Sequence, residues 1–241
     1  MFGKKLGYAK LVNGYKGDNS DVGPALYIMT EKGEADLEQV IVRLRGEKRL
    51  TMSKISYFWE AMLESVSQVH TLNIAHCDVK PANFLFVNSQ IKLIDFGFAV
   101  AIKGGYRNYA IRNFVAGTKG YLSPEAVQVD AIDHQSDDDV TFTSSTTSSF
   151  GVKSKVYMQS DIWALGVILY QLVYDGLKPY HDRPGGKLSK MRALANMEDP
   201  VTFEPTSDPD LMETLKMCLN KKPLERPTAQ ALLKHPFLTG K

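Results

Sequence analysis

The chain has 241 residues, of which 44% are hydrophobic and 23% are charged, so its composition is that of an ordinary globular protein. This excludes collagen-like, coiled-coil and wholly disordered chains. The net charge of +2 gives no argument for nucleic acid or an anionic membrane surface as a partner. Two cysteines cannot form a disulfide framework. They fit a reducing compartment, although they fit a disulfide-poor secreted protein nearly as well.

The first residues lack the apolar core of a signal peptide, and no apolar run reaches the roughly 18 residues that a membrane span needs. We therefore expect no membrane partner and an intracellular protein, cytoplasmic and/or nuclear.

The predicted elements begin with two short strands within residues 8–29, followed by a short amphipathic helix in the next twenty residues. Apolar residues at steps of three and four predict a long core-facing helix over 51–72. The turn pair Asn88-Ser89 separates two apolar runs and predicts a hairpin over 83–94.

The second half of the chain is predicted to be mainly helical. Residues 161–170 are apolar nearly all round, which predicts a buried central helix. Further helices are expected over 208–219 and 228–234. Between the halves, residues 130–155 are rich in Asp, Ser and Thr and predict a mobile surface loop. A little sheet followed by mostly helix indicates the α+β class.

The densest group of candidate functional residues surrounds the hairpin. Asp78, Lys80 and Asn83 stand just before its first strand, and Asp95 follows its second strand. A hairpin of this length brings the outer ends of its strands together, so Asn83 and Asp95 can sit side by side as oxygen ligands for Mg²⁺. Asp78 can accept a proton from a hydroxyl, and Lys80 can neutralise charge on a transferring phosphoryl group.

This ordered set closely resembles the catalytic loop and metal motif of the eukaryotic protein kinases. The strings at 78–85 and 91–97 are most similar to those of the TTK (monopolar-spindle) kinases, which are dual-specificity enzymes of the mitotic spindle checkpoint. Other kinase landmarks follow in the expected order: Gly117-Thr-Lys-Gly-Tyr121, Ser123-Pro-Glu125, Asp161-x-Trp-x-x-Gly166, Arg226 and His235-Pro-Phe237.

The resemblance implies a kinase that transfers the γ-phosphoryl group of ATP, with Mg²⁺, to Ser or Thr of a protein substrate, and in the dual-specificity case also to Tyr. It implies that Asp78 is the catalytic base and Lys80 the phosphate-side charge, and that Asn83 and Asp95 hold Mg²⁺.

The resemblance also implies an adenine site. Thr30 takes the gatekeeper position, the backbone of Glu31 and Gly33 bonds to the adenine, and Leu85 forms the floor under the ring.

The domain boundaries follow from the same resemblance. Residues 1–29 would be a two-stranded remnant of the small lobe, residues 30–36 the hinge, and residues 37–241 the large lobe with its insertion. The expected fold is therefore protein-kinase-like and α+β, with a mainly helical large lobe.

Three structural roles also follow from the resemblance. Glu125 and Arg226 are expected to form a buried ion pair, and Asp161 is expected to orient the catalytic loop from the central helix. Thr118 is expected to be a structural partner of Asp78 and Lys80 instead of a phosphorylation site.

The sequence departs from the kinase pattern before the hinge. No Gly-x-Gly-x-x-Gly precedes Thr30, and Lys4 and Lys5 lie too close to the hinge to be the phosphate-binding lysine of the small lobe. We therefore expect little or no phosphotransfer by this polypeptide alone and a dependence on an upstream segment. The alternative is a non-catalytic, kinase-like binding module that docks a protein partner.

The second departure is Cys77. Many kinases place Arg before the catalytic Asp, where it pairs with a phosphorylated activation loop. Between Asp95 and Gly117 there is no Ser or Thr, and the only hydroxyls are those of Tyr106 and Tyr109. The two features agree and predict that this loop has no Ser/Thr phosphorylation switch.

Overall fold

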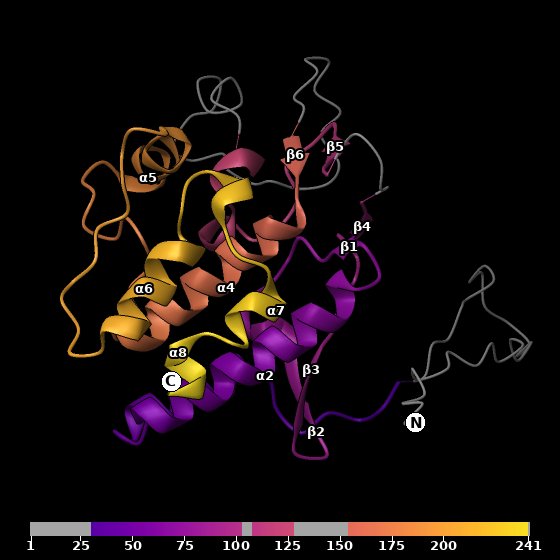
Figure 1. The fold of residues 1–241 in the computed structure, drawn as a ribbon, viewed down its shortest axis with the longest axis vertical. Coiled ribbons are helices and arrows are strands. Elements are labelled where there is room, and N and C mark those ends of the chain that lie inside the picture. The colour runs from indigo at the N-terminus through magenta and orange to yellow at the C-terminus, as the bar shows by residue number, and fades with distance from the viewer. Residues whose placement is uncertain (1–29, 103–107, 128–153, 241) are drawn as a thin grey trace, which may run out of the picture.

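The structure is a computed structural model that describes residues 30–102, 108–127 and 154–240 (Figure 1). The two strands expected within 8–29, and nearly all of the expected loop over 130–155, lie outside the described residues.

Two long helices form the centre of the described fold. Helix α2 (Met52–His70) and helix α4 (Met158–Val173) lie side by side (Figure 1). Trp59 and Trp163 are almost completely buried. Burying such large apolar side chains is the main favourable term in folding. Both helices were predicted from their apolar patterns, and both predictions are confirmed.

The remaining helices pack around this pair. Helix α1 begins where the Asp36 carboxylate accepts a hydrogen bond from the Gln39 backbone N–H at 2.8 Å, as an N-cap should. Helices α1, α6 and α7 confirm three further predictions, whereas α5 and α8 were not predicted. Their bounds are α1 Leu37–Gly46, α5 Gly186–Ala195, α6 Pro209–Cys218, α7 Ala229–Leu232 and α8 Pro236–Thr239.

The predicted hairpin is present as β2 (Phe84–Val87) and β3 (Gln90–Leu93), which pair antiparallel with Phe84 opposite Leu93. Its two turn residues, Asn88 and Ser89, have φ values of 50° and 61°. Two positive φ angles are what a tight two-residue turn needs to match the twist of its strands.

Two further antiparallel pairs lie beside the helices. Strand β1 (Ile74–Ala75) pairs with β4 (Val100–Ala101), and β5 (Ala110–Arg112) pairs with β6 (Ser154–Val156). None was predicted, because two or three residues carry too little pattern. Since β6 begins at Ser154, the loop expected over 130–155 ends before its expected boundary. Short 3-10 turns complete the described elements: η1 Pro81–Asn83, η2 Lys119–Tyr121, η3 Pro124–Ala126 and η4 Pro223–Glu225.

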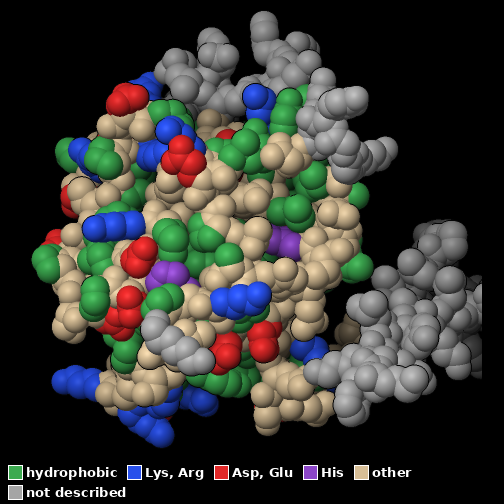
Figure 2. All heavy atoms as spheres, in the orientation of Figure 1, with side chains coloured by type: hydrophobic (Ala, Val, Ile, Leu, Met, Phe, Trp, Pro, Cys, Tyr) green, Lys and Arg blue, Asp and Glu red, His purple; other side chains and the backbone are tan. Residues whose placement is uncertain are grey.

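The distribution of charged side chains on the surface agrees with the small net charge of the chain. Acidic and basic side chains are interspersed over the face shown in Figure 2. Among the described helices, none combines the length and the apolar character that crossing a membrane would require.

Candidate active site

The loop between β1 and β2 carries most of the candidate residues, and Asp161 of α4 holds its backbone. The buried Asp161 carboxylate accepts hydrogen bonds from the backbone N–H groups of His76 and Cys77, both at 2.8 Å. It also accepts one from His70 Nε2 at 2.9 Å. These bonds confirm the prediction that Asp161 orients this loop from the central helix.

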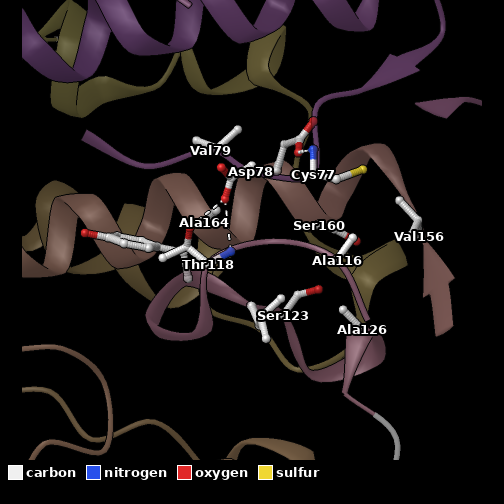
Figure 3. A pocket seen from close by; sticks show the side chains of 13 residues that line it. Cys77, Asp78, Val79, Ala116, Thr118, Ser123, Ala126, Val156, Ser160 and Ala164 are labelled. Carbon is white, nitrogen blue, oxygen red and sulfur yellow. Dashed lines mark hydrogen bonds between the residues drawn. The ribbon is translucent and has the colours of Figure 1, made fainter. Parts of the chain in front are cut away.

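Asp78 is the most highly coordinated side chain of the loop and is only 4% exposed. Its Oδ1 accepts hydrogen bonds from the backbone N–H and the hydroxyl of Thr118, at 3.0 and 2.7 Å (Figure 3). Its Oδ2 lies 2.8 Å from Lys80 Nζ and accepts a hydrogen bond from Asn83 Nδ2 at 3.1 Å. The structure therefore brings Asp78, Lys80 and Asn83 together around one carboxylate.

Lys80 connects this carboxylate to the surface. Its Nζ donates to Thr118 Oγ1 at 3.0 Å, and its side chain is about a quarter exposed. The contacts confirm that Thr118 is a structural partner of Asp78 and Lys80. Since an ammonium group is a compact charge on a flexible stem, Lys80 can leave Asp78 for a more highly charged anion.

Asn83 is also held firmly. Its Nδ2 donates to the Asp78 backbone oxygen at 2.8 Å as well as to the carboxylate, so its amide oxygen is the atom left for another ligand. The Ile94 N–H donates to the Asn83 backbone oxygen at 2.9 Å, which brings the chain just before Asp95 against Asn83. Asp95 itself is exposed and has a left-handed φ of 63°.

An amide oxygen and an exposed carboxylate are hard donors that suit Mg²⁺, which keeps several waters and takes phosphate oxygens as further ligands. In the described part of the chain no group of three or more His, Cys, Asp and Glu side chains could hold a metal. The Asn83 and Asp95 pair thus fits an ion that shares its shell with phosphate, but not a closed structural metal site.

The residues predicted to form the hinge pair with strand β2 of the hairpin. The Glu34 N–H donates to the Phe86 oxygen at 2.8 Å, and the Phe86 N–H donates to the Ala35 oxygen at 2.9 Å. A Cβ atom on Gly33 would lie 2.2 Å from Leu85 Cδ2, so only glycine allows this approach.

The predicted adenine residues are therefore only partly assembled in the described structure. Gly33 and Leu85 lie in contact, whereas Thr30 and Glu31 lie at the exposed edge of the hinge.

The sequence reasoning gave no role to His76 and Phe96. The buried His76 donates from Nε2 to the Ile94 oxygen at 3.0 Å, and its ring meets the Phe96 ring edge-on, with 4.9 Å between centroids. This contact joins the loop that carries Asp78 to the turn that carries Asp95. In the sequence, the only indication of a role for His76 and Phe96 was that they stand close to the candidate residues Asp78 and Asp95.

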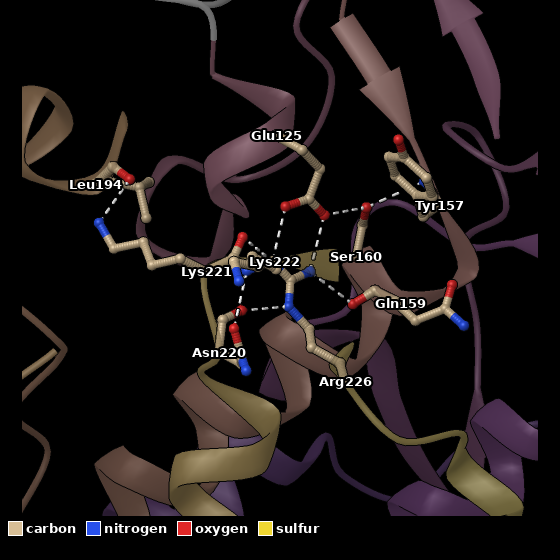
Figure 4. A network of polar contacts seen from close by, with 9 residues as sticks. All are labelled: Glu125, Tyr157, Gln159, Ser160, Leu194, Asn220, Lys221, Lys222 and Arg226. Atoms are coloured by element: carbon tan, nitrogen blue, oxygen red, sulfur yellow. Dashed lines mark hydrogen bonds and ion pairs between the residues drawn. The ribbon is translucent and has the colours of Figure 1, made fainter. Parts of the chain in front are cut away.

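A buried ion pair braces the segment that carries Thr118. Arg226 binds Glu125 with two hydrogen bonds of 2.8 and 2.7 Å, and Ser160 donates a third at 2.7 Å (Figure 4). Burial alone would raise the pKa of Glu125. The hydrogen bonds and charge of Arg226 outweigh burial and hold that pKa below its usual value. The predicted ion pair is confirmed.

Cys77 lies beside the same loop with a left-handed φ of 67°. Its Sγ lies 3.4 Å from the Ala75 oxygen. Burial raises the pKa of the Cys77 thiol, and the Asp161 charge raises it further, whereas the Arg112 charge lowers it. The thiol is therefore neutral at physiological pH and a poor nucleophile.

A small pocket lies behind the loop, lined by Cys77, Val79, Ser123 and Ala164 among others (Figure 3). Its volume of about 30 Å³ has room for one or two water molecules but not for a nucleotide.

The sequence matches the family described as Protein kinase domain over residues 13–140 and 151–238. It is 38% identical to the serine/threonine-protein kinase MPS1 of Encephalitozoon cuniculi over 89% of this chain. It is 36% identical to the probable serine/threonine-protein kinase mps1 of Dictyostelium discoideum over 88% of this chain. The dual specificity protein kinase TTK of Mus musculus is 33% identical over 88%. The matches span 31%, 20% and 23% of these relatives, respectively.

Proposed function

Because this chain belongs to the protein kinase domain family, we propose that it transfers the γ-phosphoryl group of ATP to Ser or Thr of protein substrates. The observation that carries the proposal is the arrangement of Lys80, Asn83 and Thr118 around the buried Asp78 carboxylate. The similarity to TTK extends the proposal to Tyr as a further acceptor and to a role in the mitotic spindle checkpoint.

Asp78 is proposed to act as the general base. The hydroxyl of the substrate attacks the γ-phosphorus, the bond from that phosphorus to the bridging oxygen breaks, and ADP leaves. Asp78 accepts the hydroxyl proton and aims the nucleophile. A carboxylate has about four acceptor positions, and Asp78 already has four contacts: two from Thr118 and one each from Lys80 and Asn83. One donor must therefore move when the substrate binds.

Lys80 is the donor best placed to move. Its side chain is about a quarter exposed, whereas Asn83 is buried, and its charge is attracted more strongly by phosphate than by one carboxylate. In the proposed cycle Lys80 swings from Asp78 to the γ-phosphate. This stabilises the charge that develops there and frees Oδ2 for the substrate hydroxyl.

Asn83 and Asp95 are proposed to hold Mg²⁺, which when bound neutralises phosphate charge. The hinge backbone at Glu31 and Gly33 is proposed to bind adenine, with Leu85 beneath the ring and Thr30 as gatekeeper. The contact between Gly33 and Leu85 supports this part. With ATP as the phosphoryl donor, the proposed place of action is the cell interior, in the cytoplasm or the nucleus.

The test is Mg²⁺-dependent transfer of labelled phosphate from ATP to a generic basic protein, measured for the chain and for Asp78→Asn. Transfer by the chain that the variant lacks would support the proposal. Nucleotide binding is measured in parallel, because Asp95→Asn should weaken Mg²⁺-dependent ATP binding whereas Asp78→Asn should not.

The proposal would be contradicted if neither protein transferred phosphate and the chain showed no Mg²⁺-dependent ATP binding. That outcome would favour a non-catalytic, kinase-like binding module that docks a protein partner. Binding without transfer would assign the defect to phosphate contacts outside residues 30–240, as the missing Gly-x-Gly-x-x-Gly leads us to expect.

A further inference from the structure

Protein kinases that are switched by phosphorylation use a charged contact to order the segment after the metal-binding turn. The Arg before the catalytic Asp provides the cation and a phosphorylated residue the anion. This chain has Cys77 at that position and no Ser or Thr between Asp95 and Gly117. The described parts of this activation segment, residues 95–102 and 108–126, are nevertheless ordered by strand pairing and 3-10 turns.

The cation near Cys77 comes instead from the activation segment itself. Arg112 stands at the end of β5, opposite Ser154 of β6. Cys77 packs in a small apolar cluster with Ala110 of β5 and Val156 of β6. Burial and the Asp161 charge raise the pKa of the Cys77 thiol, and the nearby Arg112 charge opposes this rise.

Arg112 also reaches the metal-binding turn. Its Nη2 donates to the backbone oxygen of Phe98, the residue after Gly97 and fourteen positions before Arg112. The chain between them passes through β4, which pairs with β1. The guanidinium carbon lies 5.7 Å from the centre of the Phe114 ring. One side chain thus links the start of the activation segment to its later half.

The second terminal nitrogen of the Arg112 guanidinium group is not used in the described structure. Its Nη1 is buried and has no hydrogen-bond partner among the residues that the structure describes. Leaving a buried charged donor unpaired is unfavourable, so packing alone does not explain an arginine at this position. A contact that needs a long cationic side chain does explain it.

We propose that Arg112 is a positioning residue that fastens the activation segment to the metal-binding turn from within, so that the order of this segment does not depend on its phosphorylation. The effect of this tether on activity rests on the proposed kinase function. The tether itself is a property of the fold and can be measured without activity.

The test is hydrogen exchange of the full chain after phosphatase treatment, with and without Arg112→Met. Loss of a hydrogen bond from a charged donor should speed amide exchange in Ala110–Arg112 by about tenfold to a hundredfold. Exchange in α4 should stay the same. Arg112→Lys keeps a donor group and the charge and should restore slow exchange. Arg43→Met removes an exposed charge from α1 and serves as the control.

A second arm uses the position of Cys77. Cys77→Arg alone adds a second cation beside β5, where Arg112 already stands, and should speed exchange in β5. The double variant Cys77→Arg, Arg112→Met returns the cation to its usual position and should exchange more slowly than either single variant.

Three results would overturn the inference: unchanged β5 exchange in Arg112→Met, equal acceleration in β5 and α4, or loss of wild-type protection after phosphatase treatment. Wild-type protein that shows the expected exchange but no phosphotransfer or Mg²⁺-dependent ATP binding would contradict the proposed function and leave the tether standing. Where the chain is active, Arg112→Met should raise the KM for the protein substrate more than the KM for ATP, and Arg112→Lys should reverse this.

Discussion

Thr118 donates both its backbone N–H and its hydroxyl to the same carboxylate oxygen of Asp78, at 3.0 and 2.7 Å. The hydroxyl oxygen also accepts from Lys80 Nζ at 3.0 Å. Thr118 therefore sets the angle of the proposed base and keeps the proposed phosphate-binding cation nearby, although it lies forty residues away in the chain.

Thr118→Val should lower kcat by about tenfold to a hundredfold, because the isosteric side chain loses hydrogen bonds to two charged groups. Thr118→Ser keeps the hydroxyl and should retain most activity. The measurement is steady-state phosphotransfer to a protein substrate. Finding that Thr118 is phosphorylated in active protein and required in that form would contradict this role, since a phosphate ester has no hydroxyl proton to donate.

Gly117 makes the approach of Thr118 possible. Its φ is +113°, and a Cβ atom there would lie 2.6 Å from the Cys77 backbone oxygen. Gly117→Ala should therefore lower the free energy of unfolding by about 1–3 kcal/mol and reduce phosphotransfer with it. Urea unfolding measures the first effect. Gly46→Ala meets nothing within 4 Å and is the matched control, expected to leave activity unchanged.

The Glu125–Arg226 pair should govern stability more than chemistry. Glu125→Gln leaves a buried guanidinium without its counter-charge and should cost about 3–5 kcal/mol of unfolding free energy. Because the folded-state pKa of Glu125 lies below its usual value of 4.5, its contribution is present above that pH and is lost as the pH falls through the folded-state pKa. Urea unfolding from neutral to acid pH should show the variant and the parent converging. A constant difference would contradict the assignment.

Lys221 should make the free energy of unfolding depend on pH in the alkaline range, whereas Glu125 does so in the acid range. Its Nζ donates to the carbonyl oxygens of Ala193, Leu194 and Asn196 at 2.7–2.9 Å, which caps the end of α5. Figure 4 shows the contact with Leu194. Burial lowers the pKa of Lys221 to about 8, from 10.5. Between these values the unfolded chain binds more protons than the folded chain, so the stability contributed at this site rises with pH.

Lys221→Met should abolish that rise and lower stability at neutral pH, since three carbonyl groups lose their donor. Lys222→Met removes the exposed neighbouring lysine and is the control. Urea unfolding at several pH values between 8 and 10.5 distinguishes the two variants. A rise with pH that persists in Lys221→Met would assign it to other groups.

The parts of the fold that could be predicted are those with a local cause. The turn at Asn88 and Ser89 requires only two residues that tolerate positive φ, and α2 and α4 carry long apolar patterns. Helix α5 was missed because part of its stability comes from Lys221, about 25 residues after its end, and no pattern within Gly186–Ala195 contains that contact.

The same distinction holds in the candidate site. Asp78, Lys80 and Asn83 lie within six residues, so their grouping was readable from the sequence. The link from Arg112 to Phe98 was not, because it depends on how β4 and β5 are placed by partners elsewhere in the chain. A basic residue in a loop has no local property that distinguishes such a tether from a solvated charge.

Asp161 binds the loop that carries Asp78 through the backbone N–H groups of His76 and Cys77, which every residue except proline possesses. The shape of the loop therefore does not depend on a hydrogen bond from the side chain at position 77. Mutational drift can exchange an arginine for a cysteine there and remove a regulatory input while the geometry around Asp78 survives. A kinase fold built this way can change how it is switched without rebuilding the site at which it acts.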